Sequence, residues 1–181
     1  MTIYTLMADG CEEVEALAVV DLLRRAKLDV ELVSVHEKEY TEGAHGIVIK
    51  NDKKLSEIYV DQEDVIFLPG GMPGTPNLKA SRPACDLLVS HAAVNGRIAA
   101  ICAAPTVLGM LGLLEGKKAT CYGGLEDQLT GAVTCTDPVV VDGNIITSRG
   151  MGTAILLGLE LVKLFVDEET SANLGKGIML P

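Results

Sequence analysis

The sequence predicts an α/β fold in which helices cover both faces of a mostly parallel central sheet. Short apolar runs of strand length alternate along the chain with segments whose apolar residues recur at helical spacing. Several of the expected strands are apolar throughout, which is typical of strands buried on both faces. Alternating strands and helices of this kind predict a parallel sheet between two helical layers.

Composition limits the classes of protein to consider. The 181 residues are 48% hydrophobic and 22% charged, so we expect one domain, residues 1–181, with a substantial core. The net charge of -10 argues against nucleic acid and anionic membranes as partners. No apolar run reaches bilayer-spanning length and the first residues lack a basic signal region, so we expect a cytoplasmic protein. Five scattered cysteines without a CxxC pair predict neither a disulfide framework nor a metal site.

The chain opens with an expected strand at 3–8, a helix from about 13 to 26 and a second strand at 29–35. Acidic residues in the first turn of the helix and basic residues in the last turn suit its dipole. Its apolar stripe is expected to contain Val14, Leu17, Ala18, Asp21 and Leu22. Glu15 lies beside this stripe, and we expect a solvated carboxylate there, with partial burial as the alternative.

The remaining elements follow from apolar runs and turn residues. Residues 36–51 are expected to form a small hairpin outside the main sheet, and 139–147 a hairpin with Asp142-Gly143 at its turn. Further strands are expected at 64–68, 96–101 and 119–121, and helices at 55–59, 83–94, from 105 onward and 153–166, with at most a short helical stretch after them.

Cys102 follows the expected strand at 96–101, and Pro105 is suited to the first turn of the next helix. The cysteine is therefore expected on a sharp strand-to-helix turn with small neighbours, Ala103 and Ala104. Free N–H groups and the helix dipole would stabilise a thiolate there, so we expect Cys102 to ionise readily. The alternative is a buried cysteine that acts as a small hydrophobe.

Three loops are expected to converge at the carboxyl ends of the strands: residues 9–13, 69–74 and 102–105. This convergence favours a functional role for Cys102. The three histidines, His36, His45 and His91, fall outside these loops and are expected on the surface. The run at 150–155 lacks the third glycine of a dinucleotide-binding motif, and we expect no cofactor.

Four segments together carry a family resemblance. They are Glu12-Glu13-Val14-Glu15, Leu68-Pro69-Gly70-Gly71, Ile101-Cys102-Ala103-Ala104-Pro105 and Thr147-Ser148-Arg149-Gly150-Met151-Gly152-Thr153. In their order and spacing the chain resembles the ThiJ/PfpI superfamily, and within it the protein deglycase and glyoxalase branch. The resemblance covers nearly the whole chain. It implies a flavodoxin-like three-layer α/β/α sandwich of the class I glutamine amidotransferase type, assembled as a homodimer.

The same resemblance implies roles for individual residues. Cys102 would be the nucleophile, Glu15 a protonated acid hydrogen-bonded to it, and the N–H groups of Gly71 and Ala103 an oxyanion pocket that Gly70 adjoins. Ala103 stands where the peptidase branch has a histidine, which argues against proteolysis. Two further positions also depart from the family: Tyr122 replaces a histidine near the cysteine, and His45 aligns with an arginine that the dimer partner contributes.

Two functions are compatible with these residues. The first is a cofactor-independent enzyme that acts on α-oxoaldehydes such as methylglyoxal, or on early glycation adducts of proteins, through Cys102 and Glu15. The second is a redox sensor or stress-response protein that uses the same thiol, because an accessible thiolate also oxidises readily. A small amidase or peptidase is disfavoured because no histidine base lies in the three loops.

Overall fold

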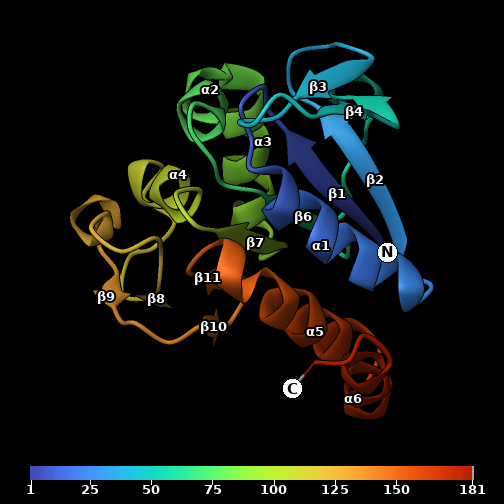
Figure 1. Cartoon of the computed structure of the whole chain (residues 1–181). Coiled ribbons are helices and arrows are strands. Elements are labelled where there is room, and N and C mark those ends of the chain that lie inside the picture. The colour runs from blue at the N-terminus through green and yellow to red at the C-terminus, as the bar shows by residue number, and fades with distance from the viewer. Residues whose placement is uncertain (181) are drawn as a thin grey trace.

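The computed structural model describes residues 1–180, which form a seven-stranded sheet flanked by helices on both faces (Figure 1). The strand order is β10-β11-β7-β6-β1-β2-β5, and all neighbouring pairs are parallel except β10 and β11. The strands are β1 (Thr2–Met7), β2 (Asp29–Ser34), β5 (Lys53–Lys54), β6 (Val65–Leu68), β7 (Arg97–Ile101), β10 (Val139–Asp142) and β11 (Ile145–Ser148). The predicted α/β fold with a mostly parallel sheet is confirmed.

Helices form the outer two layers. They are α1 (Glu13–Arg25), α2 (Gly74–Ala80), α3 (Arg82–Ala93), α4 (Pro105–Met110), α5 (Ala154–Phe165) and α6 (Glu168–Gly177). Helices α1 and α5 lie side by side on one face (Figure 1), whereas α3 and α4 pack on the other. Each face of the sheet packs against its own hydrophobic core. In strand β7, Ala99 points into one core and its neighbour Ala100 into the other, which is why the central strands are apolar throughout.

Smaller elements lie outside this sheet. Two-stranded sheets pair β3 (Tyr40–Glu42) with β4 (Val48–Lys50), and β8 (Lys118–Ala119) with β9 (Val133–Thr134). Short 3-10 turns are η1 (Leu55–Glu57), η2 (Glu126–Gln128) and η3 (Met151–Thr153). Both predicted hairpins are present: β3–β4 lies outside the main sheet, and β10–β11 turns at Gly143, whose φ is +62°.

The loops after β1, β6 and β7 meet at one edge of the sheet because their strands are parallel neighbours. Two backbone hydrogen bonds join the first two of these loops. The Glu12 N–H donates to the Gly70 carbonyl at 2.9 Å, and the Gly74 N–H donates to the Gly10 carbonyl at 2.9 Å. This edge therefore holds together the segments that carry Glu15, Gly70 and Cys102.

The predicted apolar stripe of α1 is wrong in detail. Val14 and Leu17 are exposed, whereas Glu15 is only 1% exposed and faces inward with Ala16 and Val19. The helix packs this second face against the sheet and α5. Glu15 is accommodated inside because its carboxylate finds hydrogen-bond donors at the sheet edge, so it is not the solvated edge residue that the sequence predicts.

Three other expectations are corrected. Helix α2 follows β6 where only a glycine-rich loop was expected. The tail forms a ten-residue helix, α6, which Asp167 caps and which packs on α5. His91 is 3% exposed rather than at the surface, because Gly96 lacks a side chain and the imidazole fills that space. Among residues 1–180, no helix has both the length and the apolar character needed to cross a bilayer.

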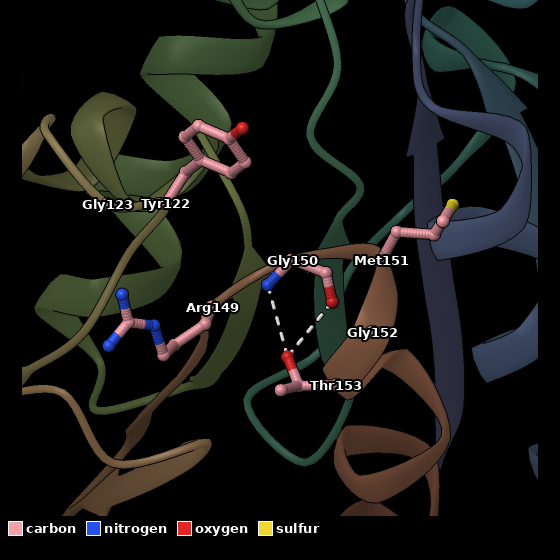
Figure 2. Close-up of a pocket in the computed structure, with 7 residues that line it drawn as sticks. All are labelled: Tyr122, Gly123, Arg149, Gly150, Met151, Gly152 and Thr153. Carbon is pink, nitrogen blue, oxygen red and sulfur yellow. Dashed lines mark hydrogen bonds between the residues drawn. The ribbon is translucent and has the colours of Figure 1, made fainter.

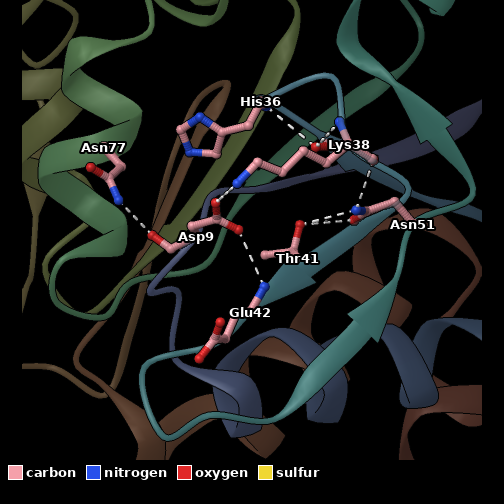
Figure 3. A network of polar contacts seen from close by, with 8 residues as sticks. Asp9, His36, Lys38, Thr41, Glu42, Asn51 and Asn77 are labelled. Atoms are coloured by element: carbon pink, nitrogen blue, oxygen red, sulfur yellow. Dashed lines mark hydrogen bonds and ion pairs between the residues drawn. The ribbon is translucent and has the colours of Figure 1, made fainter.

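A polar network fixes the β3–β4 hairpin to the loop after β1 (Figure 3). The Asp9 carboxylate accepts from Lys38 Nζ at 2.5 Å and from the Glu42 N–H at 3.2 Å. The Asp9 carbonyl accepts from Asn77 Nδ2 at 2.7 Å, which ties α2 to the same point. Burial alone would raise the pKa of Asp9, but Lys38 and the Glu42 N–H outweigh it and lower that pKa. The loop that leads into α1 is thus held from two sides.

Candidate active site

Cys102 occupies the predicted turn between β7 and α4 and has an unusual backbone conformation. Its φ is +63°, in the left-handed region that side chains other than glycine rarely adopt. The Cys102 N–H donates to the Ser148 carbonyl at 3.0 Å, and its carbonyl accepts from the Tyr122 N–H at 2.8 Å. Such a conformation costs roughly 1–3 kcal/mol and is typical of functional sites. These two hydrogen bonds hold the strained residue and fix the direction of its thiol.

Glu15 reaches the thiol of Cys102 from the first turn of α1. The Glu12 side chain caps this helix by accepting from the Glu15 N–H at 2.8 Å. The buried Glu15 carboxyl shares a hydrogen bond with the Cys102 side chain and accepts from the Gly70 N–H at 3.0 Å. Burial raises the pKa of Glu15 from 4.5 to about 7, although these hydrogen bonds act in the opposite direction. The carboxyl is therefore close to half protonated near neutral pH.

Two glycines enclose the Cys102–Glu15 pair. A Cβ atom on Gly70 would lie 2.6 Å from the Cys102 Cβ and 2.7 Å from Glu15 Oε2, which is closer than real Cβ atoms approach. A Cβ atom on Gly150 would lie 3.8 Å from Glu15 Oε1 and 4.0 Å from Cys102 Sγ. Gly70 thus permits the close approach of two chain segments and supplies the N–H that binds Glu15.

The charge state of Cys102 depends on where the shared proton lies. Burial, and then the negative charge of an ionised Glu15, raise the pKa of the Cys102 thiol to about 12, although the N–H groups of Gly71 and Ala103 lower it. The expectation of a readily ionised thiol is therefore wrong while Glu15 is a carboxylate. When Glu15 holds the proton, the repulsion disappears and the carboxyl O–H can donate to the sulfur. The thiolate is thus the partner of a protonated Glu15.

Gly71 and Ala103 direct their N–H groups at the Cys102 sulfur, as the hydrogen bonds that lower its pKa indicate. Gly71 has a φ of +97°, and a Cβ atom there would lie 2.3 Å from the Glu12 nitrogen. Only glycine fits this position, because both the backbone conformation and the lack of space exclude a side chain. These two donors would face an oxygen on any carbon bonded to the sulfur.

An open cavity of about 490 Å³ adjoins the pair (Figure 2). It is lined by Tyr122, Gly123, Arg149, Gly150, Met151, Gly152 and Thr153. Gly150 lies between the cavity and the Cys102–Glu15 pair, since a Cβ atom on Gly150 would lie 3.5 Å from the Tyr122 ring and 4.0 Å from Cys102 Sγ. Tyr122, which the resemblance places near the cysteine, lines this cavity and is 57% exposed. None of the other lining residues was predicted, although residues 149–153 belong to one of the four segments that carry the resemblance.

His45 lies on the hairpin between β3 and β4, and its contacts are with α1. Its Nδ1 lies 3.0 Å from Glu13 Oε2 and 3.8 Å from Glu12 Oε1, and its N–H donates to Glu13 Oε1 at 2.7 Å. The hydrogen bond with Glu13 raises the pKa of His45. Glu12, Glu13 and His45 place ligand atoms within 4.8 Å of one another, but both Glu13 oxygens already bind His45. The geometry is that of an ion pair, and within this chain His45 is not hydrogen-bonded to Cys102.

Known proteins resemble this chain in sequence and in fold. The model of the DJ-1/PfpI family matches residues 1–164. Protein DJ-1 homolog B of Arabidopsis thaliana is 39% identical over 97% of this chain, which spans only 41% of that longer protein. Protein dj-1beta of Drosophila melanogaster is 37% identical over 97% of this chain and 95% of its own length. The solved structure of oxidized Toxoplasma gondii DJ-1 superposes with a TM-score of 0.91 at 33% identity, covering 98% of this chain and 97% of that one.

Two further relatives have names that state an activity. Glutathione-independent glyoxalase DJR-1.2 of Caenorhabditis elegans is 33% identical over 97% of this chain and 94% of its own length. A deglycase of Pyrococcus abyssi is 31% identical over 91% of this chain and 99% of its own length. With the matched family model, the shared fold and relatives above 30% identity along nearly their whole length, the chain belongs to the DJ-1/PfpI family.

Proposed function

We propose that the protein is a cofactor-independent enzyme that converts reactive α-oxoaldehydes such as methylglyoxal, or their early adducts on proteins, into hydroxy acids. The observation that carries the proposal is the hydrogen bond between the Cys102 thiol and the buried Glu15 carboxyl, next to an open cavity. A nucleophile hydrogen-bonded to an acid–base group is the arrangement that covalent catalysis requires. The relatives named as a glyoxalase and a deglycase support an enzymatic role of this type.

The first step forms a bond between sulfur and carbon. The thiol proton of Cys102 passes to the Glu15 carboxylate as the sulfur attacks the aldehyde carbon. The carbonyl oxygen gains the electron pair, and the N–H groups of Gly71 and Ala103 stabilise its negative charge. Glu15 then gives its proton to this oxygen, which forms a hemithioacetal and returns Glu15 to the carboxylate.

The second step moves hydrogen between adjacent carbons. Glu15 takes the proton from the former aldehyde carbon, which gives an enediol, and returns it to the neighbouring carbon. The hydroxyl on the first carbon gives up its proton and becomes the carbonyl, and the oxygen on the neighbouring carbon takes up a proton, so that the product is a 2-hydroxyacyl thioester on Cys102. Water then hydrolyses the thioester, and the hydroxy acid and the free thiol are released. A carboxyl whose pKa is about 7 suits both halves of this transfer, because it accepts and gives up a proton with similar ease at neutral pH.

We further propose a homodimer that works in the cytoplasm as a single-domain chain, with no nucleic acid or membrane among its partners. Val14 and Leu17 on α1 and Ile47 and Val48 on the neighbouring hairpin are exposed apolar side chains, with exposed fractions between 38% and 61%. The Ile47 N–H approaches Glu13 at 3.4 Å, so hairpin and helix present these side chains together. A second copy of the chain would cover them, and its His45 is the residue expected to approach Cys102.

The dimer has a direct test. Leu17→Glu places a charge in the proposed interface and is expected to give a monomer in sedimentation velocity. Val89→Glu, which changes an exposed apolar residue of α3, is the matched control and is expected to sediment as the dimer. A monomeric parent protein, or a dimeric Leu17→Glu variant, would contradict the proposed interface.

A redox role for the same thiol is the second candidate. The observation that favours it is the structural likeness to a protein solved in an oxidized state. Cys102 is partly accessible, and the O–H of Glu15 could donate to the oxygen atoms of a sulfinic acid on that sulfur. The two candidates share Cys102 and Glu15, so turnover separates them.

Lactate formation from methylglyoxal without glutathione tests the enzyme proposal. Wild type and Cys102→Ser are assayed side by side, with Cys135→Ser as the control for loss of another partly exposed cysteine. Turnover in wild type and Cys135→Ser that is lost in Cys102→Ser is the expected result. No turnover in any of them, with peroxide oxidising Cys102 selectively, would replace the enzyme proposal with the redox role.

A further inference from the structure

The cavity beside Cys102 contains a single charged side chain, that of Arg149, and no carboxylate is among the residues that line it. Figure 2 shows the Arg149 guanidinium on the same side of the cavity as Gly123, while the Tyr122 ring lies across from Thr153. In a chain with a net charge of -10, this cavity is therefore a locally basic place. The guanidinium lies at the Gly123 side of the cavity, on the wall away from Met151 (Figure 2).

Arg149 has few partners of its own. Its Nη1 donates to the Thr136 carbonyl at 3.2 Å, and none of the ion pairs found within residues 1–180 includes it. The residue is half-buried, and its Nη2 would lie 3.3 Å from a Cβ atom on Gly123. A guanidinium has five N–H donors in a planar fork that matches a carboxylate. Most of these donors are thus available to a ligand in the cavity.

The backbone fixes Arg149 relative to the sulfur. The carbonyl of Ser148, the residue before Arg149, accepts a hydrogen bond from the Cys102 N–H at 3.0 Å. Gly150, the residue after Arg149, lies next to the Cys102–Glu15 pair. The opposite wall is fixed in the same way, since the Tyr122 N–H donates to the Cys102 carbonyl at 2.8 Å. A molecule bonded to the sulfur would enter the cavity beside Gly150, which directly follows Arg149 in the chain.

We propose that Arg149 determines specificity by binding a carboxylate of the substrate. This inference rests on the proposed reaction and names its substrate class: α-oxoaldehydes that bear a carboxylate a few bonds from the aldehyde. The reaction is R–CO–CHO plus water giving R–CHOH–COO⁻ and a proton, with the carboxylate in R untouched. Arg149 takes no part in the bond changes, and it orients the substrate so that the aldehyde carbon faces Cys102.

A matched pair of substrates tests the proposal. The substrates are 4,5-dioxopentanoate and its neutral methyl ester, and the product is followed as 2-hydroxyglutarate or its ester. Wild type is expected to have a kcat/KM for the acid that is about tenfold higher than for the ester, the size of one charge-assisted contact. Arg149→Gln is expected to bring this ratio close to one, and Arg149→Lys to retain part of the preference. The ratio is the readout because a purely structural role of Arg149 would change both substrates equally.

Arg82→Gln is the control, because Arg82 lies on α3 and its side chain is 90% exposed. It is expected to keep the wild-type ratio. A wild-type ratio near one, or a ratio that survives in Arg149→Gln, would overturn the proposed specificity.

A second measurement keeps the inference testable if the protein turns over neither substrate. Alkylation of Cys102 by iodoacetate and by iodoacetamide, followed by peptide mass spectrometry, compares an anionic and a neutral reagent of the same shape. The ratio of the two rates is expected to fall several-fold from wild type to Arg149→Gln, because the cation no longer attracts the anion. An unchanged ratio would overturn the anion site, whatever the outcome for the proposed reaction.

Discussion

Glu15 and Cys102 share a hydrogen bond at the carboxyl edge of the sheet, although one belongs to the first helix and the other to the turn after β7. The Gly70 N–H, at 3.0 Å from Glu15 Oε2, holds the carboxyl in place from a third segment. The pair can lose one proton near neutral pH, and the remaining proton can lie on either group.

The stability of the protein should fall as the pH rises from about 4.5 to about 7, because over this range Glu15 is ionised in the unfolded state but still protonated in the native state. The folded-state pKa of about 7 exceeds the unfolded value of 4.5, so the native state binds more protons in this range. Glu15→Gln removes the buried charge. It should therefore raise the free energy of unfolding at pH 8 by up to about 3 kcal/mol, with a much smaller effect at pH 4.

Urea unfolding of wild type and Glu15→Gln at the two pH values measures this difference. Asp21→Asn is the control, because Asp21 lies on the same helix and its side chain is 60% exposed. An equal effect of Glu15→Gln at pH 4 and pH 8 would show that Glu15 does not carry a raised pKa.

The pH dependence of catalysis should follow the same group. At low pH both Glu15 and Cys102 are protonated and no base is available. The kcat/KM for methylglyoxal should therefore rise through an apparent pKa of about 7 and then level off. A steady-state pH profile checks this, and a rise centred near pH 9, the ordinary range of an isolated thiol, would assign the proton to Cys102 alone.

Gly70→Ala should disable the site. The new methyl group would lie 2.6 Å from the Cys102 Cβ and 2.7 Å from the Ile101 carbonyl oxygen, so the backbone must move. We expect a destabilisation of about 1–3 kcal/mol together with a large loss of Cys102 alkylation rate. Gly177→Ala, in a place where no atom lies within 4 Å of the added Cβ, is the control and should leave the alkylation rate unchanged without destabilising the protein. Thermal unfolding and the alkylation rate are the readouts, and a normal site in Gly70→Ala would refute the close approach.

The strained backbone of Cys102 predicts an inverted order of stabilities. Because φ is +63°, Cys102→Gly should be more stable than Cys102→Ala by about 1 kcal/mol. At Cys85, inside α3, the order should reverse, since glycine destabilises a helix relative to alanine by about 1 kcal/mol. Chemical denaturation of the four variants checks both orders. The same order at both positions would contradict the left-handed conformation of Cys102.

The sequence was sufficient to predict the sheet and the turn that carries Cys102. An apolar run such as 96–101 is buried on both faces only when it forms a central strand of a sheet that helices cover on both sides. Pro105 marks the start of the helix that follows. Parallel strands then bring the loops after β1, β6 and β7 to one edge, which is why three distant segments could be assigned to one site.

The spacing of apolar residues alone does not predict the burial of Glu15, because that burial depends on partners far away in the sequence; only the family resemblance placed Glu15 beside Cys102. The spacing of apolar residues in α1 favours the face with Val14 and Leu17, yet the structure leaves both exposed. The face of α1 that carries Glu15 is the buried one, because the Gly70 N–H and the Cys102 thiol form hydrogen bonds with the Glu15 carboxyl. Arg149 belongs to one of the four segments that carry the resemblance, but its place on the wall of the cavity depends on the folded chain.

The most direct test of the account follows the hydrogen that Glu15 is proposed to move. Methylglyoxal is converted in deuterium oxide and the lactate is analysed by proton NMR. Transfer through a carboxyl that exchanges with solvent should place deuterium on C2 of a substantial fraction of the lactate. Lactate with only protium at C2 would indicate a direct hydride shift between the two carbons, and it would contradict the role of Glu15 as the group that carries the proton.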